Sequence, residues 1–169
     1  DPTPGEVFLL EGVTDADGPE DVTATKIATG LLNPMGVDVV DGNLWVSERD
    51  GLTELTPDAD GDGMLENRRH ADWPYGGTFH EFAFGLLHDE ENFYVSLSVA
   101  IDNGGATTNP QPADGRGTTY AVDRETGEIS AVSGGLRTPN GMGWGPDDEL
   151  FVMDNQGAWL PASKMVQVE

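Results

Sequence analysis

GLRTPNGMGWGPDDELFVMDNQG, residues 135–157, is the stretch that decides the fold. It contains a glycine-rich segment at 141–145, a tight turn at 146–148 and an apolar run of strand length at 149–153. Glycines inside a strand allow its backbone to lie close to a neighbour. Polar side chains stand at both ends of the stretch, and such positions often form binding sites. The sequence therefore predicts a strand–turn–strand module with a site at its polar ends.

The same module occurs near the beginning of the chain. Residues 33–36 lead into an apolar strand at 37–40, a turn at Asp41-Gly42 and a second strand at 44–46. The following pairs of positions match between the two copies: Pro34 with Pro139, Gly36 with Gly141, Glu48 with Asp154. The repeat indicates that the chain is built from copies of one supersecondary unit.

A looser middle copy completes the pattern, with strands at 82–87 and 93–95. The second strands of the three copies begin at 44, 93 and 150, a spacing of roughly 50 residues that is typical of propeller blades. Strands repeating at this period predict an all-β fold, a β-propeller of about three four-stranded blades. We expect one domain over 1–169, with repeats near 33–56, 80–132 and 135–169. A β-sandwich, the other all-β choice, needs no such repeat.

The composition is strongly acidic. The 169 residues include 31 acids and 8 lysines or arginines, giving a net charge of −23. This charge repels nucleic acid and anionic membranes, and no apolar run has membrane-spanning length, so neither partner is expected. The acidity is typical of a soluble surface or of halophilic adaptation. A chain that starts at Asp1 could be a mature secreted protein, so we expect an extracellular or periplasmic location.

An acidic loop, DADGDG at 58–63, follows the first copy. Oxygen ligands at alternate positions with a glycine in the sixth place are what a calcium loop requires. The twelfth position is Arg69 instead of a glutamate, so the loop is not a standard EF-hand. The predicted ligands of a smaller, structural Ca²⁺ site are Asp58, Asp60, Asp62 and Glu66. The alternative is an acidic surface turn.

His80 stands immediately before the strand of the middle copy, where Arg137 and Asn140 stand in the third copy. If the copies are blades, these three side chains approach one central region. An isolated histidine is more often structural than catalytic, so both interpretations remain. The long segment 102–117 has the composition of an irregular loop, which could cover a cleft or be an insertion.

Several of these segments together resemble a known family. The segments are HEFAFG at 80–85, NFYV at 92–95, GLRTPNG at 135–141, DNQG at 154–157, LWVSERDG at 44–51 and the DADGDG loop. They look like the six-bladed propellers of the soluble glucose/sorbosone dehydrogenase superfamily, which includes quinoprotein sugar dehydrogenases and the large propellers of bacterial membrane-bound dehydrogenases. The resemblance extends over about 32–169.

The resemblance implies a cofactor and a chemistry. In that superfamily pyrroloquinoline quinone (PQQ) lies across the mouth of the central channel, and a histidine accepts the proton of a sugar or alcohol hydroxyl. By position His80 matches this base, Arg137 matches an arginine that binds the cofactor, and Thr138 and Asn140 lie beside it. Thr138 stands where the family often has asparagine. An oxidised alcohol needs such a proton acceptor beside a hydride acceptor.

The length departs from the family. Three repeats do not close a ring, and an open propeller leaves sheet edges unpaired. The chain is thus expected to be a fragment, to self-associate with a second copy into a six-bladed ring, or to have kept the fold without the cofactor. Self-association is favoured. Two other functions remain open: a non-catalytic extracellular binding or assembly module, and a calcium-dependent lactonase of the gluconolactonase type. The lactonase would use Glu48, Asn140 and Asp154 as oxygen ligands.

Overall fold

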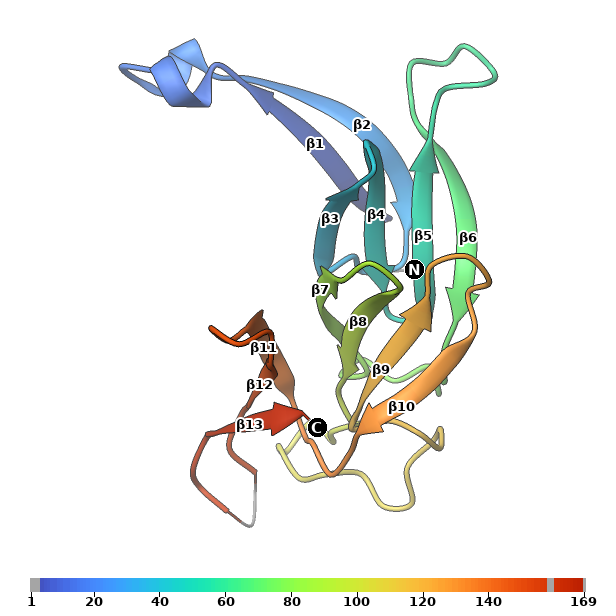
Figure 1. Ribbon diagram of the computed structural model, residues 1–169, viewed down its shortest axis with the longest axis vertical. Coiled ribbons are helices and arrows are strands. Elements are labelled where there is room, and N and C mark those ends of the chain that lie inside the picture. The colour runs from blue at the N-terminus through green and yellow to red at the C-terminus, as the bar shows by residue number, and fades with distance from the viewer. Residues whose placement is uncertain (1–3, 158–159, 169) are drawn as a thin grey trace.

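The structure is a computed structural model that describes residues 4–157 and 160–168. Its strands form a fan of antiparallel sheets (Figure 1). The first sheet contains β3 (Gly36–Val40), β4 (Asn43–Glu48), β5 (Gly51–Thr56) and β6 (Glu66–Asp72), hydrogen-bonded in that order. The second contains β7 (Ala83–His88), β8 (Asn92–Leu97), β9 (Thr118–Asp123) and β10 (Ile129–Ser133). The third contains β11 (Pro139–Trp144), β12 (Leu150–Asp154) and β13 (Lys164–Val168).

A two-stranded ribbon precedes these sheets. It pairs β1 (Gly5–Glu11) with β2 (Thr23–Leu31), and two 3-10 turns, η1 (Val13–Asp15) and η2 (Pro19–Asp21), lie at its tip. The ribbon extends away from the rest of the chain in Figure 1. Its base packs on the first sheet through a cluster of buried apolar side chains: Ala28, Leu31, Val46 and Leu55.

The first strands of the three sheets lie next to one another. β7 contacts both β3 and β11, so each sheet radiates outward from a common inner edge. This arrangement, two sheets of four strands and one of three, is a partial β-propeller and confirms the all-β propeller prediction.

The main core lies between the first and second sheets. Successive residues of a strand point to opposite faces, so Trp45 enters this core while Val46 enters the ribbon interface. The Trp45 ring lies 4.6 Å from the ring of Phe93, measured between centroids. Burial of large aromatic and branched side chains on both facing sheets holds the two blades together.

The sheets extend the predicted repeats in one respect. The first repeat, predicted over 33–56, continues through β6 at 66–72, which pairs with β5 along the far side of the acidic loop. The third repeat, predicted over 135–169, includes residues 158, 159 and 169, which lie outside the described part of the chain.

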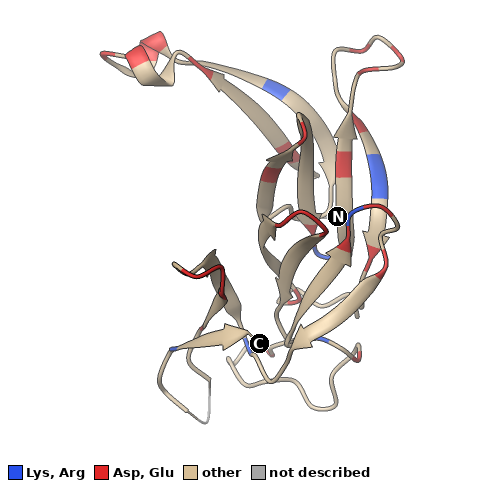
Figure 2. Cartoon of the chain, viewed as in Figure 1, with Lys and Arg blue, Asp and Glu red and all other residues tan. Residues whose placement is uncertain are grey.

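Many of the acidic residues lie in the turns and at the tip of the ribbon, as Figure 2 shows. None of the helical segments in the described ranges is long and apolar enough to cross a membrane.

Candidate functional site

The fan has two rims. The loop rim carries the segments that lead into the first strand and out of the second strand of each sheet, at 32–35, 49–50, 73–82, 98–117, 134–138, 155–157 and 160–163. The turn rim carries the tight turns and hairpin loops at 41–42, 57–65, 89–91, 124–128 and 145–149. Contacts between neighbouring segments tie the loop rim together: Arg49 of the first blade donates to Thr78 O, and Val99 N of the second blade donates to Arg137 O. His80 and Arg137 therefore share the loop rim.

His80 is half-buried just before β7. Its Nδ1 lies 3.4 Å from the carbonyl oxygen of Val99. A carbonyl only accepts, so this contact places the proton on Nδ1 and leaves Nε2 as the basic nitrogen. The rings of Phe79 and Phe82 stand edge-on to the imidazole, with centroids at 5.8 and 5.5 Å. The histidine is thus held in one orientation.

Arg137 spreads its guanidinium over neighbouring loops. Nη1 donates to Gln156 O at 2.8 Å, Nη2 donates to Gly105 O at 2.6 Å, and Nε donates to Thr107 Oγ1 at 3.4 Å. The residue lines a cleft of about 450 Å³ together with Lys164 and Asp154. In this arrangement the arginine connects the long loop to the third sheet.

Thr138 and Asn140 flank Pro139, the first residue of β11, and differ in exposure. Thr138 is buried, and its Oγ1 has no hydrogen-bond partner among the described residues. Asn140 is exposed and lines a groove of about 380 Å³ with Gly85 and Met142, between β7 and β11. The four residues predicted for the base and the cofactor thus occupy the loop rim and the groove just inside it.

A buried polar side chain closes the loop rim of each blade. Glu48 accepts the backbone N–H of Leu32, Ser98 Oγ accepts that of Phe82 at 2.8 Å, and Asp154 Oδ1 accepts that of Thr138 at 2.8 Å. In each blade this contact joins the end of the second strand to the segment that leads into the first. The matching of Glu48 with Asp154 in the sequence has this structural cause.

These contacts weaken the lactonase hypothesis. Glu48 also accepts from Thr53 Oγ1 and lies 3.5 Å from Arg69, while Asp154 also accepts from Arg137 N at 3.0 Å and lies 3.7 Å from Lys164. The two carboxylates belong to different sheets, and each is occupied within its own blade. They serve as structural acceptors.

Arg116 is a residue that the sequence did not indicate. Its buried guanidinium donates to four carbonyl oxygens: Ser98 at 2.8 Å, Arg49 at 3.1 Å, Pro74 at 2.9 Å and Phe82 at 2.6 Å. Burial lowers the pKa of Arg116 to about 10, and nearby Glu81 opposes this shift. The arginine anchors the long loop to the first two blades. In the sequence it stands between two glycines of an irregular loop, and nothing in that pattern predicts a buried arginine.

Glu81 fixes the segment in front of the histidine. It is fully buried and accepts Gly76 N at 3.0 Å, Thr78 N at 2.8 Å and Thr78 Oγ1 at 3.0 Å. A buried carboxylate with several donors is a rigid anchor for a loop. It stands directly after His80 in the chain and so helps to position it.

Arg49 is the second cation that the sequence did not assign to the site. Its guanidinium carbon lies 4.4 Å from the centre of the Phe82 ring, and Nη2 donates to Phe79 O. Nε is buried without an acceptor among the described residues. Arg49 therefore lies beside the aromatic rings that surround His80.

The acidic loop lies on the turn rim, between β5 and β6. Ligand oxygens of Asp58, Asp60 and Glu66 lie within 4.8 Å of one another, and Asp62 is outside this group. Asp62 Oδ1 instead accepts Met64 N at 2.8 Å. Backbone N–H groups of Gly61 and Gly63 lower the pKa of Asp58, which keeps it ionised. Calcium binding stays a prediction. The carboxylates close enough together to bind the ion are those of Asp58, Asp60 and Glu66.

Comparison with solved structures finds similar folds. A protein of Carbohydrate-Active Enzymes Family AA12 from Trichoderma reesei, in an iodide structure, matches 96% of this chain with a TM-score of 0.65 and 13% identity. The PQQ domain of pyranose dehydrogenase from Coprinopsis cinerea, in its holo form, matches 91% with a TM-score of 0.42 and 16% identity. The first likeness, at this identity, is one of fold.

The chain spans about half the length of these structures, 46% of the first and 49% of the second. No protein-family model matches the chain. No curated protein matches it by sequence.

Proposed function

We propose that the chain is part of a PQQ-dependent sugar or alcohol dehydrogenase, with the active site on the loop rim. The observation that carries the proposal is the position of Val99, whose carbonyl binds His80 and whose N–H binds the carbonyl of Arg137. The base and the cofactor-binding residue implied by the family resemblance are thus held by one residue. The names of the two similar structures, a carbohydrate-active enzyme and a PQQ domain, agree with this chemistry.

His80 is the proposed base. With the proton on Nδ1 directed at Val99 O, Nε2 can accept the proton of a sugar hydroxyl. The flanking rings of Phe79 and Phe82 restrict rotation of the imidazole and exclude part of the solvent. PQQ, when bound, supplies the hydride acceptor.

The residues on this rim fit a carboxylate-bearing cofactor. Arg137 and Lys164 line the same cleft and supply the cations that a polyanion needs in a protein of charge −23. Thr138 Oγ1 is a buried hydroxyl without a partner among the described residues, beside Arg137. A cofactor carboxylate could take the place of the loop carbonyls that Arg137 now binds.

A second half is required for a closed channel. β3 exposes Val37 and Val39, at 58% and 59%, on the ribbon-facing side of the sheet, where the ribbon does not cover this strand. We propose that further blades, from a second copy or a longer chain, cover this face. Light scattering at two protein concentrations tests self-association: a mass of twice 18.0 kDa supports a second copy, and 18.0 kDa contradicts it.

Reconstitution with PQQ and Ca²⁺ tests the enzyme. The expected result is a shifted PQQ absorbance band and reduction of a dye when an aldose is added. His80→Gln should keep the absorbance shift but lose at least a hundred-fold in kcat, about the contribution of a general base. Arg137→Met should weaken PQQ binding. His88→Gln, a histidine on the turn rim, is the matched control. No absorbance change and no turnover would remove the proposal.

A non-catalytic binding or assembly module is the second candidate. The observation in its favour is that all three nitrogens of the Arg137 guanidinium bind groups of the chain itself. In that case Arg137→Met lowers stability and PQQ leaves the thermal unfolding unchanged. Both can be read from the same preparations.

A further inference from the structure

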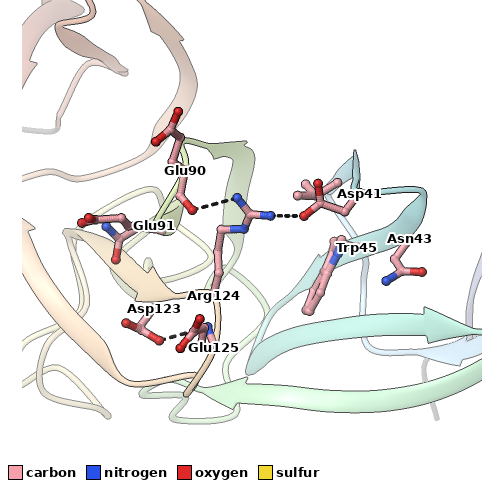
Figure 3. Close-up of a pocket in the computed structure, with 10 residues that line it drawn as sticks. Asp41, Asn43, Trp45, Glu90, Glu91, Asp123, Arg124 and Glu125 are labelled. Atoms are coloured by element: carbon pink, nitrogen blue, oxygen red, sulfur yellow. Dashed lines mark hydrogen bonds and ion pairs between the residues drawn. The ribbon is translucent and has the colours of Figure 1, made fainter.

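A cleft of about 570 Å³ lies on the turn rim, opposite the proposed active site. The β3–β4 turn of the first blade and the β7–β8 and β9–β10 turns of the second form its walls, and Trp45 closes it on one side (Figure 3). Nothing in the proposed dehydrogenase chemistry uses these residues.

The guanidinium of Arg124, which lines the cleft, already binds groups of the chain itself. Arg124 Nη1 donates to Asp89 O at 2.9 Å and to Glu90 O at 3.0 Å, and Nη2 binds the carboxylate of Asp41. Figure 3 shows the guanidinium bridging the two blades in this way. Arg124 therefore holds the cleft in shape and has little capacity left for an anionic ligand.

The remaining polar groups are acceptors. Five carboxylates line the cleft: Asp41, Glu90, Glu91, Asp123 and Glu125. Asp123 accepts from the backbone N–H groups of Glu125 and Thr126, and Asp41 pairs with Arg124. The side chains of Glu90, Glu91 and Glu125 carry no hydrogen bond or ion pair to the described residues. A matching ligand brings hydrogen-bond donors and positive charge.

Trp45 requires that the ligand also carry a hydrogen-bond acceptor. It is 8% exposed, and its Nε1 has no acceptor among the described residues. In Figure 3 the nitrogen-bearing edge of the ring lies toward Asp41, at the wall of the cleft. An indole N–H only donates, so a ligand that satisfies it brings an acceptor oxygen as well. Asp41 lies at the tip of a turn with its side chain 81% exposed, so it can move outward to admit that oxygen while Arg124 keeps its bonds to Asp89 O and Glu90 O.

A metal ion does not meet these requirements. Among the described His, Asp and Glu residues, the group with ligand atoms close enough for an ion is Asp58, Asp60 and Glu66, away from this cleft. A bare cation also offers no acceptor to Trp45. A neutral sugar supplies hydroxyls but leaves the carboxylates without a counter-charge.

We propose that this cleft binds an amino sugar unit, an organic ammonium ion that carries hydroxyl groups. Its ammonium group binds the carboxylate of Glu125, and one of its hydroxyl oxygens accepts the N–H of Trp45. The ammonium group of an adjoining unit binds Glu90, which also lines the neighbouring cavity. N-acetylation removes the charge and so removes the match.

A neighbouring cavity extends the site. It has a volume of about 600 Å³, shares Glu90 and Arg124 with the first, and is lined by Trp144. Trp144 is 40% exposed, and its ring stands edge-on to Tyr94 at 5.4 Å. An exposed, oriented indole face attracts sugar C–H groups and organic cations. The ligand is therefore an oligomer of amino sugars, with a second unit on Trp144.

The test is calorimetric titration of the chain, without PQQ, with the glucosamine trimer and with its fully N-acetylated form. We expect binding of the trimer in 0.15 M salt and at least a ten-fold weaker affinity for the acetylated form. Spermidine, which has charge but no acceptor oxygen, serves as the comparison for plain attraction to an acidic protein. Equal affinity for the acetylated trimer, or for spermidine, overturns the proposal.

Variants locate the site. Glu90→Gln and Glu125→Gln should each weaken trimer binding by up to about five-fold, the loss expected for one exposed ion pair. Asp15→Asn, the same charge change at the far tip of the ribbon, is the matched control and should have no effect. Trp45→Phe should bring the trimer down to the affinity of spermidine, provided that its melting curve stays cooperative. Loss of affinity in Asp15→Asn equal to that in Glu90→Gln contradicts the assignment. PQQ reconstitution can fail without affecting any of these outcomes.

Discussion

The hydroxyl of Tyr94 donates a hydrogen bond of 2.7 Å to Oδ2 of Asp89, across the turn between β7 and β8. The pair changes the ionisation of both groups. Burial opposes ionisation of Asp89, but the bonds from Tyr94, Asn92 and Glu91 outweigh it and lower the pKa of the carboxyl. Burial together with the bond to Asp89 raises the pKa of Tyr94 to about 12.

This pair predicts a pH dependence of stability. A tyrosine whose pKa is raised in the folded state contributes stability below its unfolded value of 10, and this is lost as pH rises through about 12. The Asp89 contribution is present above 3.8 and is lost as pH falls below that value. Tyr94→Phe should cost about 1 kcal/mol at pH 7 and remove the alkaline component. Urea unfolding between pH 7 and 12 measures both, with Tyr75→Phe as control; identical curves for Tyr94→Phe and the parent would contradict it.

Arg116→Met should be strongly destabilising. The change leaves the four carbonyl oxygens of Ser98, Arg49, Pro74 and Phe82 without this donor inside the structure. We expect a loss of about 3–5 kcal/mol in the free energy of unfolding and faster proteolysis within 98–117. Lys26→Met is the matched control because its ion pair with Glu6 is exposed on both sides, at 38% and 37%, so its loss should stay within about 1 kcal/mol. Equal effects of the two changes would show that Arg116 does not anchor the loop.

Calcium should raise the melting temperature if the acidic loop binds it. At a free concentration a hundred times Kd the stabilisation is about 2.7 kcal/mol. Asp58→Asn should abolish the shift, because Asp58 belongs to the group with Asp60 and Glu66. Asp62→Asn should keep the shift, because Asp62 lies outside that group. Calorimetry with Ca²⁺ and with a chelator decides; the same melting temperature in both removes the calcium prediction.

Asp154→Ala should destabilise the third blade. The backbone N–H groups of Arg137 and Thr138 lose their acceptor, and we expect a cost of about 2 kcal/mol. Asp154→Asn keeps one oxygen and should cost less. Asp147→Ala, an exposed acid on the turn rim, is the control. Hydrogen exchange at residues 137 and 138 gives a local readout, and unchanged protection in Asp154→Ala would show that the contact is dispensable.

The inner strands could be predicted from the sequence because they alternate apolar residues between punctuating turns. The segment 66–72 could not, since ENRRHAD has no such alternation. It forms β6 because tertiary contacts decide: Arg68 pairs with Glu54 at 2.8 Å and Arg69 with Asp50 at 2.9 Å, while His70 packs edge-on to Trp45. Edge strands of this kind are determined by their neighbour.

For the candidate site, the sequence placed His80 and Arg137 at equivalent points of two repeats, and the structure places both on one rim. It missed Ser98, which takes the position of Glu48 and Asp154 with a different side chain. A hydroxyl and a carboxylate can both accept a backbone N–H, so the function of the position is shared although the residue type differs. Arg116 escaped notice because its partners are carbonyl groups far away in the chain.

Val99 touches both His80 and Arg137 through its own backbone. Because both residues are bonded to Val99, we expect them to move together when the second and third blades move relative to each other. The distance between them then changes little. In the proposed enzyme, changes in the surrounding loops can therefore alter the substrate preference while the distance between His80 and Arg137 stays the same.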